Sequence, residues 1–188
     1  IGYRGAARYL REPDLFALEM EAITRIRREY SNLSLMIPFV RTTTELRKVL
    51  QLVEESGLRR GPDFQIWMMT EVPSNVFLLD EFINEGIDGI SIGSNDLTQL
   101  VLGIDRDNER FAEEFDERDP AVLKALEEVI STAKRRGITV SICGQGPSEH
   151  PDLTERLVRW GITSVSVTPD MIDKTRRLVA DAEAQIGG

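Results

Sequence analysis

Five short apolar runs alternate with helical patterns along the chain, and this alternation constrains the fold more than any other feature. Each run has the length of a buried strand, and the residues after it place apolar side chains at helical spacing. Repeated strand–helix units form a parallel sheet through right-handed crossovers. We therefore predict one α/β domain over residues 1–188, with strands at 33–40, 64–72, 90–93, 139–143 and 164–167.

The predicted helices follow the strands throughout. The strand at 33–40 is a nearly continuous apolar run, which is typical of a strand buried on both faces of a parallel sheet. Residues 104–117 form an irregular, charged segment. The apolar spacing predicts helices at 13–30, 42–57, 73–82, 96–103, 120–136, 153–160 and 171–185.

Five such units are too few for a closed eight-stranded barrel, which typically needs ~250 residues. The sheet is therefore either open and doubly wound, or part of a barrel is missing. The glycine-rich signatures of nucleotide-binding sheets, GxGxxG after a strand and GxxxxGK[ST], do not occur in the sequence.

The composition excludes several classes of partner. Lysine and arginine number 23 against 32 aspartates and glutamates, and the net charge of −9 should repel nucleic acid and anionic membranes. A single cysteine favours a reducing, cytoplasmic setting, and no apolar run reaches the length of a membrane span. Because the chain begins at Ile1 and continues into a Gly-Tyr-Arg-Gly turn, we expect it to be a piece of a longer protein.

Polar residues stand where three successive predicted strands end. They are Glu71, the pair Asn95 and Asp96, and Cys143. Neighbouring parallel strands would bring them to one rim, roughly 5 to 10 Å apart given the strand spacing of about 4.8 Å. Two carboxylates at this spacing suit Mg²⁺ or Mn²⁺. The alternatives are a general acid/base pair and ordinary helix caps, and we favour the metal.

Cys143 and two arginines complete the candidate site. A lone cysteine at a strand end is more often a small core residue, but beside a metal-bound anion a thiol can exchange a proton with a carbon centre. Arg106, beyond the third strand, and Arg4, in the opening loop, have the planar fork that suits carboxylate and phosphate. Considered alone, each arginine is also consistent with an ordinary solvent-exposed position that binds nothing. His150, the only histidine, is expected to be exposed.

Seven motifs resemble a known family in order and spacing, and the resemblance covers essentially the whole chain. It is to the C-terminal, phosphoenolpyruvate-binding part of the phosphoenolpyruvate synthase (pyruvate, water dikinase) family, and the motifs are GYRGAARYL, MIPFVRT, MMTEVPSN, DGISIGSNDLTQLVLGIDRD, FDERDPAV, ICGQGPS and GITSVSVTPD. Pyruvate phosphate dikinases and enzyme I of the sugar phosphotransferase system share the SIG-x-NDL core. The residues Pro73-Ser74-Asn75 and the Gly-Gln that follows Cys143 favour the synthases over these relatives.

The resemblance implies a TIM barrel that binds phosphoenolpyruvate or pyruvate. Glu71 and Asp96 correspond to the family's Mg²⁺ ligands, and Cys143 corresponds to the acid/base that acts on the substrate methyl carbon. The reaction of the family converts pyruvate, ATP and water to phosphoenolpyruvate, AMP and phosphate, through a phosphohistidine on a separate swivelling domain. The positions that correspond to substrate contacts are Arg4, Asn95 and Arg106.

The chain also departs from the family. It matches only the later five of eight barrel strands, and the ATP-binding and phosphohistidine domains are absent from it. We therefore expect it not to perform the full reaction alone. The two unpaired sheet edges lead us to expect a homodimer, a domain-swapped closure or marginal stability. The alternative from a different functional class is a non-catalytic oligomerisation module with idle rim residues.

Overall fold

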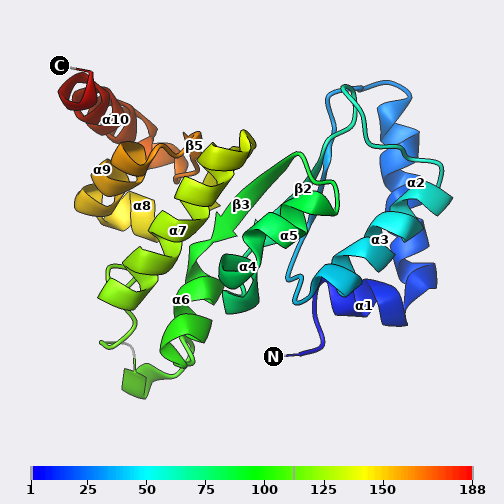
Figure 1. The fold of residues 1–188 in the computed structure, drawn as a ribbon, viewed down its shortest axis with the longest axis horizontal. Helices are drawn as coiled ribbons and strands as arrows, with labels where there is room; N and C mark the ends of the chain where they lie inside the picture. Colours follow the sequence, from blue (N-terminus) through cyan, green and yellow to red (C-terminus); the bar gives the residue numbers. More distant parts are fainter. Residues whose placement is uncertain (1, 112, 188) are drawn as a thin grey trace.

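The computed structural model describes residues 2–111 and 113–187, and it shows a five-stranded parallel sheet (Figure 1). The strands lie side by side in chain order, and every neighbouring pair runs parallel. This confirms the α/β fold of parallel βα repeats. The strands are β1 (Leu35–Ile37), β2 (Ile66–Thr70), β3 (Gly89–Gly93), β4 (Thr139–Cys143) and β5 (Ser164–Val165).

Helices follow each strand, and Figure 1 shows α5 and α7 lying across one face of the sheet, with α6 below the carboxyl end of β3. Two short 3-10 helices, η1 (Glu109–Phe111) and η2 (Pro169–Met171), interrupt the connections. The helices are α1 (Ala6–Arg11), α2 (Pro13–Arg27), α3 (Thr43–Glu55), α4 (Pro73–Phe77), α5 (Leu79–Asn84), α6 (Ser94–Leu102), α7 (Pro120–Arg136), α8 (Gly146–Glu149), α9 (Pro151–Trp160) and α10 (Ile172–Ile186).

Only one face of the sheet is fully covered. In β2 and β4 buried residues alternate with half-buried or exposed ones, and in β1 Met36 is 40% exposed between its better buried neighbours. The prediction that the strand at 33–40 is buried on both faces is therefore wrong. Only β3, at the centre, is buried at every position. A parallel sheet with one open face is what part of a barrel leaves when the strands that would close it are absent.

The first strand is shorter than its apolar run because its backbone cannot continue the ladder. Pro38 has no N–H to donate, and Phe39 turns into the left-handed region with φ 48°. The predicted helix over 73–82 is likewise divided at Leu78, and α1 lies in a stretch for which no element was predicted. The strand at 139–143 agrees with its prediction.

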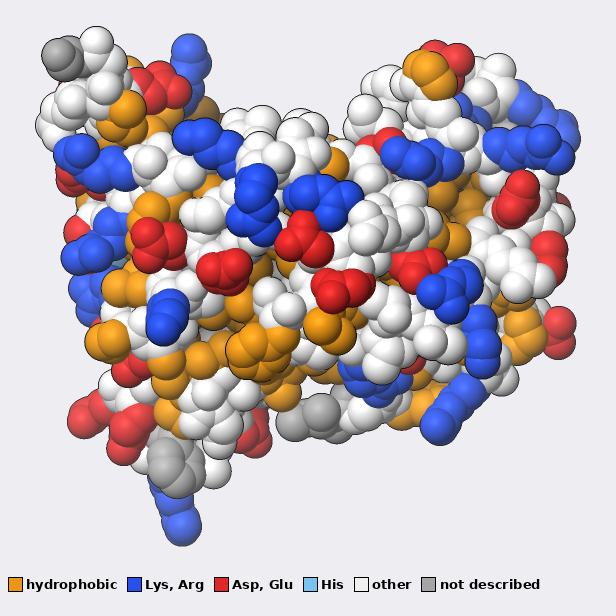
Figure 2. Space-filling view, in the orientation of Figure 1, with side chains coloured by type: hydrophobic (Ala, Val, Ile, Leu, Met, Phe, Trp, Pro, Cys, Tyr) orange, Lys and Arg blue, Asp and Glu red, His pale blue; other side chains and the backbone are white. Residues whose placement is uncertain are grey.

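An ion-pair cluster joins α5 to α7 on the covered face. Asp80 accepts hydrogen bonds from Arg135 Nη2 at 3.0 Å and from Arg136 Nη1 at 2.8 Å, and Arg136 Nη2 also donates to Asn84 Oδ1 at 2.7 Å. Figure 2 shows acidic and basic side chains interspersed on this face, which fits a solvated helix layer. These contacts tie the helices that flank β3 to each other.

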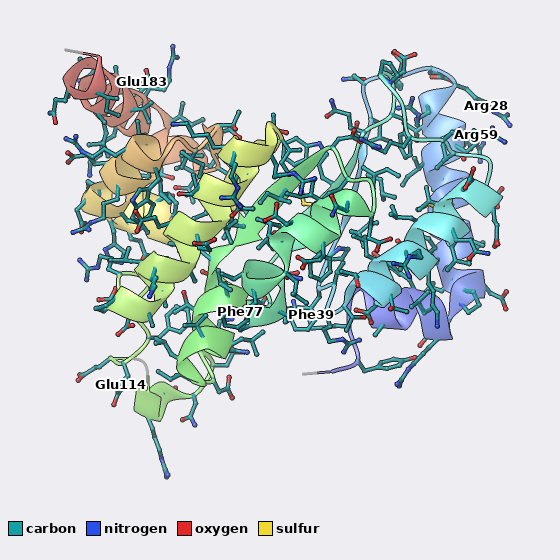
Figure 3. The ribbon with its side chains drawn as sticks, viewed as in Figure 1. Arg28, Phe39, Arg59, Phe77, Glu114 and Glu183 are labelled. Carbon is teal, nitrogen blue, oxygen red and sulfur yellow. The ribbon has the colours of Figure 1, made fainter. Side chains whose placement is uncertain are left out.

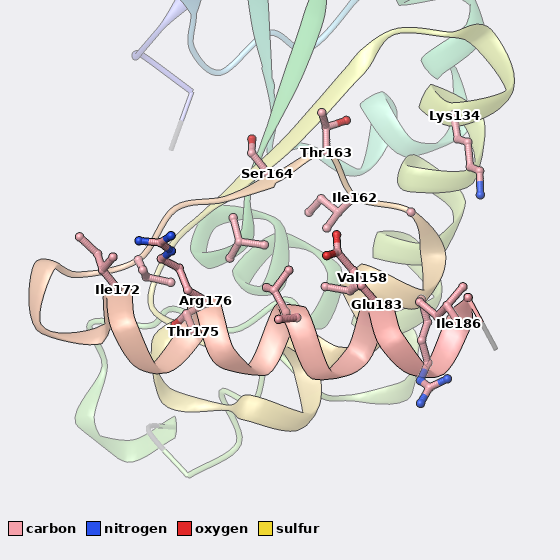
Figure 4. Close-up of a pocket in the computed structure, with 17 residues that line it drawn as sticks. Lys134, Val158, Ile162, Thr163, Ser164, Ile172, Thr175, Arg176, Glu183 and Ile186 are labelled. Carbon is pink, nitrogen blue, oxygen red and sulfur yellow. The ribbon is translucent and has the colours of Figure 1, made fainter.

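The sheet is open at both edges, β1 and β5. Beside β5, a groove of about 730 Å³ runs between this edge and α10 (Figure 4). Ile162, Val165, Ile172 and Val179 are among the residues that line it. The open edges agree with an incomplete barrel, and dimerisation through them stays a prediction. Within the described ranges, no helix has the length and hydrophobicity needed to cross a membrane.

The core assignment predicts contrasting effects of the same substitution at two leucines. Leu46 in α3 is 0% exposed, whereas Leu18 in α2 is 63% exposed. We expect Leu46→Ala to lower the free energy of unfolding by about 2–5 kcal/mol, because it leaves a cavity. Leu18→Ala should change it by less than about 0.5 kcal/mol. Urea denaturation measures both values, and equal losses would contradict the assigned packing.

Candidate functional site

The carboxyl ends of β2, β3 and β4 meet at one rim of the sheet. Thr70 pairs with Ile92, and Gly93 pairs with Cys143, so the strands end level with one another. Glu71, Asp96 and Cys143 are therefore brought to the same edge, as the sequence predicts. In Figure 3 this edge faces downward, and Phe39 is labelled there.

Glu71 is a buried carboxylate with defined partners. It is 2% exposed, and its Oε1 accepts the backbone N–H of Phe39 at 2.7 Å. Its own N–H donates to Asn75 Oδ1 at 3.2 Å, and Asn75 in turn donates to Val40 O at 2.7 Å. Burial raises the pKa of Glu71 above its ordinary value, the Phe39 N–H opposes this, and the neighbouring charge of Asp96 raises the pKa further.

Gly93 is required where β3 passes Glu71. A Cβ at this position would lie 2.6 Å from Glu71 Oε2 and 2.9 Å from Glu71 Cβ. The carboxylate therefore lies directly against the backbone at the end of β3. Only glycine leaves room for this close approach.

Asp96 forms a two-point ion pair with Arg4. Its two oxygens accept from Arg4 Nη1 at 2.9 Å and from Nη2 at 3.1 Å. The residue is 9% exposed, and the N-cap of α6 is Gly93, with no side-chain capping hydrogen bond. The alternative that Asn95 and Asp96 serve as helix caps is therefore wrong, because both lie inside the first turn of α6. Instead, Asp96 reaches across to the opening loop.

Asn95 lies between Arg106 and Glu117, a buried acid for which the sequence predicted no role. With its amide oriented to satisfy both neighbours, Asn95 donates to Glu117 Oε1 at 3.2 Å and accepts from Arg106 Nη1 at 3.2 Å. Glu117 is 4% exposed, and burial raises its pKa above the ordinary value of 4.5. Hydrogen bonds with Ser94 and with the backbone of Gly146 lower that pKa in part.

Cys143 is half-buried at the end of β4. Ser91 Oγ lies 3.6 Å from its Sγ, and the thiol can donate to Ile92 O at 3.5 Å. Ser94 Oγ donates to the Cys143 carbonyl at 3.1 Å, which links the cysteine turn to the start of α6. The thiol thus has polar neighbours on β3 and is partly accessible.

A cleft of about 590 Å³ opens beside this rim and is lined by Arg4, Asp96 and Arg106. Two arginines and the strand-end carboxylate of Asp96 thus face one cleft, whereas Glu71, Asn95 and Cys143 are not among its lining residues. Arginine pairs of this kind suit an anionic ligand. The larger groove near α10 is mostly lined by apolar side chains, so we place the site at the charged cleft. Among residues 2–111 and 113–187, no group of three or more His, Cys, Asp or Glu side chains is arranged to hold a metal ion. Any cation there would rest on two carboxylates plus substrate and water.

Two residues near the rim, Phe39 and Glu117, received no predicted role, and the prediction for His150 is wrong. Phe39 escaped prediction because its role depends on a backbone angle, and Glu117 because it lies in a charged segment without periodicity. His150 was expected to be exposed, but it is half-buried at the start of α9. The FDERDPAV motif contains Glu117 and was the only signal that could have pointed to it.

Comparison with known proteins gives a consistent result. Residues 1–184 match the family described as "PEP-utilising enzyme, PEP-binding domain". The phosphoenolpyruvate synthase of Aeropyrum pernix is 55% identical over 99% of this chain and 23% of its own length. Those of Pseudomonas aeruginosa and Aquifex aeolicus are 47% and 45% identical over 98% and 100% of this chain, and over 24% and 22% of their own lengths. The chain thus spans about a quarter of the length of these relatives.

A solved structure shares the fold. The crystal structure of RipC from Yersinia pestis aligns with a TM-score of 0.55 over 81% of this chain and 67% of that one. At 15% sequence identity, this likeness concerns the fold alone.

The raised pKa of Glu117 predicts a pH-dependent difference between wild type and Glu117→Gln. Because folding favours the protonated carboxyl, the contribution of Glu117 is fully present below about pH 4 and is lost as pH rises through the raised pKa. We therefore expect the Tm of Glu117→Gln, relative to wild type, to increase between about pH 4 and pH 7. Glu114→Gln, at an exposed position nearby, is the control for removing one acidic side chain. A Tm difference for Glu117→Gln that shrinks as pH rises would contradict the assignment.

Proposed function

The chain belongs to the family of PEP-binding domains of PEP-utilising enzymes, and on this premise we propose that its rim binds phosphoenolpyruvate and pyruvate in a pyruvate, water dikinase reaction. One observation carries the proposal: Arg4, Asp96 and Arg106 line one cleft. The relatives that cover this chain are phosphoenolpyruvate synthases, which supports this reaction over the other reactions of the family.

Two arginines of the cleft, Arg4 and Arg106, are the groups that would bind such an anionic substrate. Arg106 is the arginine for the phosphate, and Asn95 holds its guanidinium from the other side. Arg4 is 48% exposed in its side chain and lines the cleft, so it can contact an anion while it remains beside Asp96. We assign both arginines and Asn95 to substrate binding.

The carboxylates fit a divalent cation. Burial is the main cause of the raised pKa of Glu71, and the charge of Asp96 adds to it. A cation between the two carboxylates would stabilise their charged forms. Glu71 and Asp96 are the residues that would hold Mg²⁺, with substrate oxygens and water completing its shell. Mg²⁺ bound there would stabilise the negative charge of an enolate. An acid/base role for the two carboxylates is less well supported, because one is deeply buried and the other is paired with Arg4.

Cys143 is assigned to proton transfer at the methyl carbon. In the direction of synthesis its Sγ acts as the base that takes a proton from the methyl group of pyruvate, and the C–H electron pair becomes the double bond of the enolate. The enolate oxygen then attacks the phosphorus of a phosphohistidine, and the P–N bond breaks. The histidine and the ATP-binding site would lie elsewhere in the full-length enzyme, since the chain corresponds to about a quarter of its relatives.

A second candidate is a non-catalytic oligomerisation module. It is favoured by the open edges β1 and β5 and by the apolar groove beside α10. In that case the rim would bind neither metal nor substrate. Ligand binding therefore separates the two candidates.

We expect calorimetry to detect Mg²⁺-dependent binding of phosphoenolpyruvate. Glu71→Ala and Asp96→Ala should each weaken it by at least about tenfold, because each removes one of only two protein ligands. Glu81→Ala, an exposed acid on α5, should bind as wild type does. Binding without Mg²⁺, or binding that both rim variants retain, would contradict the metal assignment, and no binding by any folded form would favour the oligomerisation module.

The role of Cys143 can be tested without ATP. Exchange of the pyruvate methyl protons for solvent deuterium, followed by proton NMR, reports enolisation alone. We expect Cys143→Ser to slow this exchange by at least about a hundredfold, because general acid–base catalysis contributes about 10²–10⁴-fold. Pyruvate binding should persist, and wild-type exchange in the variant would exclude Cys143 as the base.

A further inference from the structure

Phe39 adopts a backbone conformation that bulky residues rarely accept. Its φ is 48°, and it is the one non-glycine residue with a positive φ among those the structure describes. The left-handed region costs roughly 1–2 kcal/mol for a residue with a Cβ. The residue is 3% exposed, so packed neighbours and not solvent surround it. Backbone strain of this kind persists only where the surrounding structure holds it, and strained residues cluster at functional sites.

The backbone of Phe39 positions Glu71. The turn places its N–H 2.7 Å from Glu71 Oε1, immediately after β1 ends at Ile37 and Pro38. An N–H freed from the sheet ladder is thus used on the buried carboxylate. A charge-assisted hydrogen bond of this length fixes the side chain that we assign to the metal.

The ring of Phe39 positions Arg4. The guanidinium carbon of Arg4 lies 4.5 Å from the ring centroid, while its nitrogens pair with Asp96. The opening loop is fixed to this turn by a hydrogen bond from Ala6 N–H to Pro38 O at 3.0 Å. The two segments also pack so closely that a Cβ on Gly5 would lie 2.6 Å from Phe39 Cβ. The guanidinium is therefore bracketed by a π face and a carboxylate.

We propose that Phe39 is a positioning residue that contacts both halves of the site, through its backbone N–H on one side and its ring on the other. Its N–H orients the carboxylate for the cation, and its ring orients Arg4 for the anion. A guanidinium held in advance loses less conformational freedom when the anion binds. The inference rests on the proposed function, and it adds a residue that touches neither metal nor substrate.

A matched control exists in the same chain. Phe64 is also 3% exposed, and the guanidinium carbon of Arg27 lies 4.8 Å from its ring centroid. Phe64 precedes β2, so it lies at the opposite end of the strand from Glu71. Phe64→Leu removes an equivalent contact without touching the rim.

The test compares Phe39→Leu, Phe39→Gly and Phe64→Leu by calorimetric titration of Mn²⁺ alone and then of phosphoenolpyruvate with Mn²⁺. Both Phe39 variants keep the N–H, and glycine also accepts the left-handed angle without strain. We expect both to lower the affinity for phosphoenolpyruvate by about threefold to tenfold, without lowering the affinity for Mn²⁺. Phe64→Leu should change neither affinity.

The experiment separates failure of this inference from failure of the proposed function. If the wild-type chain binds no phosphoenolpyruvate, the proposed function fails and this inference fails with it. If wild type binds and the Phe39 variants match it, only the inference is overturned. Equal weakening by Phe39→Leu and Phe64→Leu, or a parallel loss of Mn²⁺ affinity in both Phe39 variants, would show general destabilisation and would also overturn it.

Discussion

A carboxylate removed from water sets the requirements for the whole rim. Glu71 is 2% exposed, and an ionised carboxyl at such a depth costs several kcal/mol unless charges or hydrogen bonds compensate it. The end of β1 turns to supply an N–H, Asn75 secures the backbone behind it, and Arg4 neutralises the adjacent Asp96. These partners come from three separate segments: the turn after β1, helix α4 and the opening loop. The position of one side chain therefore links the opening loop, β1, β2 and α6 into a single unit.

The open sheet gives this unit its setting. Helices cover one face, while alternate residues of β1, β2 and β4 remain half-buried or exposed on the other. A closed barrel would bury these residues among the inward side chains of the remaining strands. At one edge of this sheet, β5 has two residues, and a groove lies between it and α10. The charged cleft and the apolar groove lie at different parts of the sheet, so assembly and ligand binding can use separate surfaces.

The sequence specified the fold and the rim better than it specified the contacts between them. Glu71, Asp96 and Cys143 could be placed at one edge because strand ends in a parallel repeat are readable from local periodicity. The ion pair of Asp96 with Arg4 joins residues that are 92 positions apart, and no local pattern reports it. The left-handed turn at Phe39 depends on the loop pressed against it, and the burial of Glu117 depends on Ser94 and Gly146. Tertiary neighbours decided these features, so local reasoning could not reach them.

The close approach at Gly93 has a consequence for how this site can change over generations. Every single-nucleotide change of a glycine codon that alters the amino acid introduces a Cβ, and here that atom would meet both Oε2 and Cβ of Glu71. The carboxylate cannot move aside freely, since Phe39 and the end of β2 hold it. No one-step substitution at this codon is sterically neutral. The position behaves as a fixed point around which the surrounding loops can vary.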